Sequence, residues 1–129
     1  MRSVLLVCLI LLLPHVTSAN EGGGGAGPQY IEVGPKLIVN LANSKQLMKI
    51  NPQLLVEGPE AIDEVKKHMP AIKNALIMLY SSRRAEDLAT AEQREALRLE
   101  TFETIKNVLE ERGSGEGFED VFFSDFRIN

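Results

Sequence analysis

The apolar residues between positions 90 and 112 recur at three- and four-residue steps, the spacing of one face of an α-helix. Thr90 and Gln93 form a capping-box pattern at its start, and no Gly or Pro interrupts the segment before residue 113. The predicted buried face consists of Phe102, Ile105, Val108 and Leu109, with Leu97 and Leu99 near its edges. The opposite side is predicted to carry Arg94, Arg98, Glu103, Lys106 and Glu110. Such a helix must pack on another element.

A glycine-rich turn at residues 113–117 ends this helix, and residues 118–128 then predict a strand. Four of the five phenylalanines lie in this last segment. Val121 and Phe123, together with Phe126 and Ile128, require apolar cover. A single strand is not stable alone, so it must join a sheet formed earlier in the chain.

The other strands are predicted at residues 36–41 and 47–56, with a shorter one at residues 31–33. In the first of these, Leu37, Val39 and Leu41 alternate and would share one face. A turn at residues 43–44 would join the two longer segments into a hairpin. Pro52 cannot donate a backbone hydrogen bond, so it predicts either a sheet edge or a bulge in the middle of the second strand.

Residues 59–81 predict two helices that meet at Pro70, where the ring forces a break or a kink. Pro59 suits the first helical position. The predicted buried residues are Ala61, Ile62, Val65 and Met69 in the first helix and Ile72, Ala75, Leu76 and Leu79 in the second. Met69 and Met78 are interpreted as core filler. The whole pattern predicts an α+β fold, in which a small antiparallel sheet (an N-terminal hairpin plus the C-terminal strand) packs on three helices.

Residues 1–19 have the pattern of a signal peptide or a short N-terminal anchor. Arg2 precedes an apolar run at residues 4–13, Pro14 breaks it, and small residues follow at 17–19. As a helix the run would span about 15 Å, half of a hydrocarbon core of about 30 Å. Residues 20–29 are a Gly-rich linker, either a leash to the membrane or a free N-terminus after cleavage. Residues 30–129 form the domain, which we expect to work outside the cytoplasm.

Composition excludes several classes of function. With a formal net charge of −4, the chain has no dense stripe of Lys and Arg for nucleic-acid phosphates. The single cysteine, Cys8, lies in the leader, so the domain has neither a disulfide nor thiol chemistry. His68 has no second His or Cys at ligand spacing and is expected at the surface or at a helix cap. No Gly-x-Ser-x-Gly pattern is present. We predict no catalytic residues, no cofactor and no metal; partner-binding residues stay unassigned.

The order of these segments resembles the FliL family of bacterial flagellar basal-body-associated proteins, over residues 30–129. The residues that carry the resemblance are Tyr30, the strands at 37–41 (LIVNL) and 54–57 (LLVE), Pro70, the segment 88–92 (LATAE) with the long helix after it, and the terminus 121–129 (VFFSDFRIN). Three features depart from the family pattern. The leader is too short for the family's usual membrane span, Gln93 replaces a residue that is often Gly, and the linker is unusually rich in glycine.

The resemblance implies a periplasmic domain of the stomatin/prohibitin type and a non-enzymatic role. It further implies that the protein assembles near the flagellar stator on the periplasmic side of the inner membrane, oligomerises as a ring, and supports swimming or swarming motility. Partners would be stator and basal-body proteins, with inner-membrane association and no nucleic acid. An alternative from another class is a periplasmic module that binds a small ligand or a lipid, unrelated to the flagellum. That alternative predicts an enclosed apolar pocket.

Overall fold

The computed structural model of this chain describes residues 27–42 and 45–129. Its elements in chain order are β1 (Pro28–Glu32), β2 (Leu37–Asn40), β3 (Leu47–Glu57), α1 (Pro59–Lys67), α2 (Met69–Ser81), a 3₁₀ turn η1 (Ala85–Leu88), α3 (Ala91–Glu110) and β4 (Phe118–Ile128). The strand β1 therefore begins within the 20–29 stretch assigned above to the linker. The predicted leader at 1–19, the linker up to residue 26 and the turn at 43–44 lie outside the described residues.

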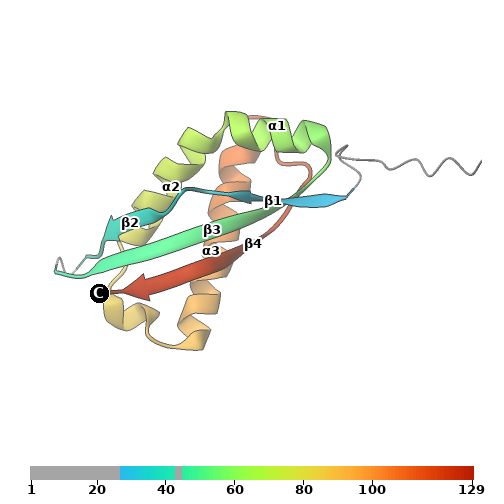
Figure 1. The fold of residues 1–129 in the computed structure, drawn as a ribbon. Helices are drawn as coiled ribbons and strands as arrows, with labels where there is room; N and C mark the ends of the chain where they lie inside the picture. Colours follow the sequence, from blue (N-terminus) through green and yellow to red (C-terminus); the bar gives the residue numbers. More distant parts are fainter. Residues whose placement is uncertain (1–26, 43–44) are drawn as a thin grey trace, which may run out of the picture.

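The long strand β3 is the centre of the four-stranded antiparallel sheet (Figure 1). Both β1 and β2 pair with one of its sides, where Tyr30 lies opposite Leu55 and Leu37 opposite Ile50. The other side pairs with β4 along most of its length. The predicted sheet, an N-terminal hairpin completed by the C-terminal strand, is confirmed.

Pro52 lies in this central strand, so the prediction of a sheet edge is wrong and that of a bulge is confirmed. The register between β3 and β4 shifts between Asn51 and Pro52, because Asn51 pairs with Asp125 and Pro52 with Phe123. Ser124 is the extra residue, and its hydroxyl donates to the Asn51 carbonyl at 3.3 Å. The bulge thus accommodates a residue that has no N–H to donate.

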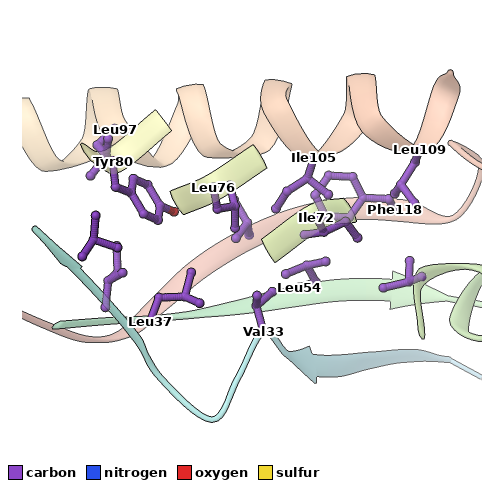
Figure 2. Close-up of a cluster of buried hydrophobic side chains, with 14 of the residues drawn as sticks. Val33, Leu37, Leu54, Ile72, Leu76, Tyr80, Leu97, Ile105, Leu109 and Phe118 are labelled. Atoms are coloured by element: carbon purple, nitrogen blue, oxygen red, sulfur yellow. The ribbon is translucent and has the colours of Figure 1, made fainter. Parts of the chain in front are cut away.

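Helices α1, α2 and α3 cover one face of the sheet, and the core lies between the two layers (Figures 1 and 2). Figure 2 shows Leu54 of β3, Ile72 of α2 and Ile105 of α3 meeting there, and all three are fully buried. Burial of one such side chain stabilises the fold by about 1.5–3 kcal/mol. The three-helix packing predicted from the sequence is confirmed.

The long helix begins where the sequence predicts. The Thr90 hydroxyl accepts a hydrogen bond from the Gln93 amide, and the Gln93 side chain accepts one from the Thr90 amide, which completes the capping box. Pro59 is at the first turn of α1, also as predicted. The break between α1 and α2 comes at His68, two residues before Pro70, so Pro70 lies in the first turn of α2.

Four side chains are placed differently from the prediction. Leu97 is at the centre of the buried face of α3 and not at its edge, since it is only 1% exposed. Arg94 and Arg98, expected in solvent, lie over the rings of Phe126 and Phe122 of β4. Met78 is 66% exposed, so it is not core filler. For Arg94 and Arg98 the reason is that β4 packs along one flank of α3, which the helix pattern alone does not reveal.

Candidate interaction face of the sheet

The uncovered face of the sheet is the part of the described fold that offers exposed side chains on a rigid frame. In β3 the residues Met48, Ile50, Leu54 and Val56 point into the core. Side chains alternate between the faces of a strand, so their neighbours point the other way. We call this side the outer face; its described residues include Tyr30, Glu32, Ile38, Lys49, Gln53, Leu55, Glu57, Phe122, Asp125 and Arg127.

Two aromatic rings lie side by side across this face. Tyr30 of β1 is 64% exposed and Phe122 of β4 is 40% exposed. Their ring centroids are 6.3 Å apart, in an edge-to-face arrangement. Leu55 of β3 lies opposite Tyr30 in the register and is half-buried. Together these residues form an apolar surface that the rest of the described chain leaves open.

An acidic pair adjoins these rings. Glu57 ends β3 on the same face as Leu55, and Glu119 is the extra residue of a second bulge, between Asp120 and Phe118. A hydrogen bond to the Glu57 carboxyl, together with desolvation and the negative charge of Glu57, raises the pKa of Glu119. We call Tyr30, Leu55, Phe122, Glu57 and Glu119 the outer-face patch.

Asp120 and Asp125 have cations of their own. Asp125 pairs with Lys36 and with Arg127, each at 3.1 Å. Its hydrogen bonds to Arg127 and Lys36 lower the pKa of Asp125. Asp120 lies 2.7 Å from Arg98 of α3. No Lys or Arg in the described part of the chain forms an ion pair with Glu57 or Glu119.

Arg98 also protects the free edge of β4. Its guanidinium donates to the Val121 carbonyl at 3.1 Å, while the Val121 amide donates to the Asp120 carboxylate at 2.8 Å. Both backbone groups of Val121 are thus occupied by side chains. The hydrogen bonds and charges of Glu95 and Asp120 raise the pKa of Arg98. Capped edges of this kind resist pairing with further strands.

A cavity of about 440 Å³ lies where the start of α1 meets the turn before β4. It is lined mainly by glutamates and glycines, including Glu57, Glu60, Glu64, Glu116, Gly113 and Gly117. The Ser114 hydroxyl donates to the Glu64 carboxylate at 2.6 Å. This bond, with the charges of Lys67 and His68, lowers the pKa of Glu64.

His68 lies between the two helices, as the C-cap residue of α1 and the N-cap residue of α2. Its Nε2 atom lies 3.3 Å from Glu64 Oε2. The prediction of a surface or capping role is confirmed. Within residues 27–42 and 45–129, no three His, Cys, Asp or Glu side chains come together as metal ligands.

The outer-face patch was not identified from the sequence. One signal was present: since Val121 and Phe123 needed cover on one face of a strand, Phe122 between them had to point to the other. The Glu57–Glu119 pair had no such signal, because it depends on how β3 and β4 align. Register across 60 residues is set by the whole sheet.

No helix in the described part of the chain is long and apolar enough to cross a membrane. Comparison with known proteins gives two agreeing results. The model of the family "Flagellar basal body-associated protein FliL" matches residues 30–128. A flagellar protein FliL from Aquifex aeolicus (strain VF5) is 34% identical over 96 residues, which cover 73% of this chain and 57% of that protein.

The matched residues contain every strand and helix of the domain from Tyr30 onward, including the capped helix and the terminal aromatic strand. The family expected from the sequence resemblance is thereby confirmed. The chain spans 57% of the length of its Aquifex relative, so the match covers the folded domain and not that whole protein. This chain belongs to the FliL family of flagellar basal body-associated proteins.

Proposed function

We propose that this protein is a non-enzymatic component of the flagellar motor, which assembles near the stator and supports swimming or swarming. The observation that carries the proposal is the FliL family match across the domain, at 34% identity to a flagellar relative. The rigid sheet with exposed aromatic side chains adds support, because a scaffold protein acts by contacts. Stator and basal-body proteins are the proposed partners, and a ring of identical subunits is the proposed assembly.

The domain organisation forms part of the proposal. Residues 1–19 act as a signal peptide or a short anchor, residues 20–29 as a Gly-rich linker, and residues 30–129 as a periplasmic domain of the stomatin/prohibitin type. The apolar run at residues 4–13 and the glycines after it support this division. The protein would then work on the periplasmic side of the inner membrane.

The alternative of a small-ligand or lipid module has no observation in its favour. It requires an enclosed apolar pocket. The cavity at the start of α1 is lined by glutamates instead, including Glu57, Glu60 and Glu64. Anionic lipid headgroups and fatty acids would be repelled there.

The test is deletion of the gene in the native bacterium, followed by measurement of swimming speed and of swarm expansion. We expect loss of one or both, restored by the wild-type gene, together with co-purification of the full-length protein with basal bodies. Normal motility of the deletion strain, with the protein absent from purified basal bodies, would contradict the proposal. N-terminal sequencing of the exported product separates the signal peptide from the anchor.

A further inference from the structure

The two aromatic residues of the outer-face patch are preorganised for contact with a partner. Tyr30 and Phe122 come from strands on opposite sides of β3, and their rings meet edge to face at 6.3 Å. The sheet fixes both backbones, so little conformational entropy remains to be lost when a partner covers them. Aromatic side chains with this degree of exposure are typical anchors of protein interfaces.

The acidic part of the patch has a charge that the chain does not balance. Asp120 and Asp125, also on β4, are each paired with Arg or Lys. Glu57 and Glu119 instead face each other, and a hydrogen bond between their carboxyl groups, together with desolvation and the negative charge of Glu57, raises the pKa of Glu119. A cation brought to this point would relieve the repulsion between the two carboxylates.

We propose that the outer-face patch binds a segment of another protein that presents an apolar side chain next to Lys or Arg. The apolar side chain would cover Tyr30 and Phe122, and the cation would lie between Glu57 and Glu119. The inference rests on the proposed function for the identity of the partner as a motor protein. It adds the chemistry of recognition, which the family match does not supply.

Charge complementarity favours this occupant over the other candidates. The chain's own residues 1–26 contain one Lys or Arg, Arg2, so this segment brings a single cation to the acidic pair. A second copy carries the same net charge of −4, so contacts between copies in the proposed ring are expected at surfaces other than this acidic pair. An anionic membrane surface would be repelled by the same carboxylates. A protein segment with an apolar side chain next to Lys or Arg matches both halves of the patch, since the apolar side chain covers the rings and the cation pairs with the carboxylates.

The experiment places a photo-reactive phenylalanine analogue at Tyr30 in the full-length protein, expressed from its own locus in motile cells. The cross-linked peptide is then identified by mass spectrometry. We expect a peptide from a second protein, with Lys or Arg within a few residues of the cross-link. The same analogue at Asn107, exposed on α3 and away from the sheet, is the matched control and should give no such product.

Charge reversal tests the acidic half. Glu57→Lys with Glu119→Lys should lower the cross-link yield about tenfold, since attraction is replaced by repulsion. Glu103→Lys with Glu111→Lys makes an equal change of charge at exposed positions in α3 and at its C-terminal end. This control should lower the cross-link yield by less than about twofold. Circular dichroism and melting curves verify that both variants fold.

Several results would overturn the inference: no cross-link at Tyr30, a cross-link to a second copy, to residues 1–26 or to lipid, or a yield that charge reversal leaves unchanged. Co-purification with basal bodies is measured in the same cells. If it persists while the cross-link is missing, the patch is wrong and the proposed function stands. If both are missing, both fail.

Discussion

Tyr80 heads the largest fully buried side chains, and it brings a polar hydroxyl into the core. That hydroxyl lies 2.9 Å from the Thr101 oxygen, which itself donates to the Leu97 carbonyl at 2.8 Å. Since the Thr101 proton is already used, Tyr80 must be the donor of the first bond. Desolvation then raises the pKa of Tyr80 and keeps it a neutral donor. A single chain of hydrogen bonds thus ties α2 to α3 inside the core.

Replacing Tyr80 by Phe should lower the free energy of unfolding by about 1–2 kcal/mol, because the buried Thr101 oxygen loses its donor. Urea unfolding with an unchanged slope measures this. Tyr30→Phe is the matched control: it removes a hydroxyl from an exposed ring and should change stability by less than about 0.5 kcal/mol. Equal losses in the two variants would show that the buried pair contributes nothing special.

Glu119 supplies a prediction about pH. Its pKa in the folded state lies above the ordinary value of 4.5, so the folded protein holds this proton more tightly than the unfolded chain. The resulting stabilisation is present at low pH and is lost as the pH rises through the raised pKa. Glu119→Gln cannot ionise and should therefore melt at a higher temperature than the wild type at about pH 7, but not below about pH 4.

Glu57→Gln should raise the melting temperature at about pH 7 in the same way. Either substitution removes the same repulsion, so the double variant should gain less in melting temperature than the two single variants added together. Melting curves at both pH values give the comparison. If Glu119→Gln stabilises equally at both, the repulsion between the two carboxylates is not its cause.

At the scale of elements, the junction before β4 is the tightest point of the fold. Gly117 has a φ of +83°, and its carbonyl accepts a hydrogen bond from the Glu57 amide at 2.8 Å. A Cβ atom there would lie 2.4 Å from the Ala61 Cβ and 2.6 Å from the Glu57 carbonyl oxygen. This glycine lets the start of α1, the end of β3 and the start of β4 meet.

Gly117→Ala should therefore lower the free energy of unfolding by about 3 kcal/mol or more, because the backbone would be strained and the new Cβ would clash with its neighbours. Gly113→Ala separates the two causes. It also has a positive φ, of +70°, but a Cβ there meets nothing within 4 Å. We expect Gly113→Ala to lower the free energy of unfolding by about 1 kcal/mol, measured by chemical denaturation. Similar losses at both positions would mean that the close approach at Gly117 has no energetic weight.

The elements that the sequence predicted well are those with local signals. The capping box at Thr90, the prolines at 59 and 52, and the apolar residues of β4 each act within a few residues. The helix starts and the strand followed from them, and Pro52 limited its own position to an edge or a bulge. What depends on tertiary pairing did not follow. Arg98 looked like a solvent residue because nothing in its own helix reveals that β4 lies beside it.

At the scale of the whole molecule, the core and the exposed face of the sheet have different roles. The helices lie on one face of the sheet (Figure 1) and form the core with it, whereas the other face carries exposed aromatic rings and acids. Exposed aromatic and acidic side chains contribute little to stability. Substitutions on this face can thus alter its contacts without altering the fold. We expect the protein to act through that face.

The most direct test compares two single variants in a deletion strain, Tyr30→Ser and Met78→Ser. Both replaced side chains are apolar and similarly exposed, 64% and 66%, but Tyr30 lies in the outer-face patch and Met78 on α2. Both proteins should be produced and fold as the wild type does. Swarm expansion is the measurement: we predict that Tyr30→Ser falls toward the deletion strain while Met78→Ser matches the wild type. Full swarming by Tyr30→Ser at wild-type protein levels would contradict the claim.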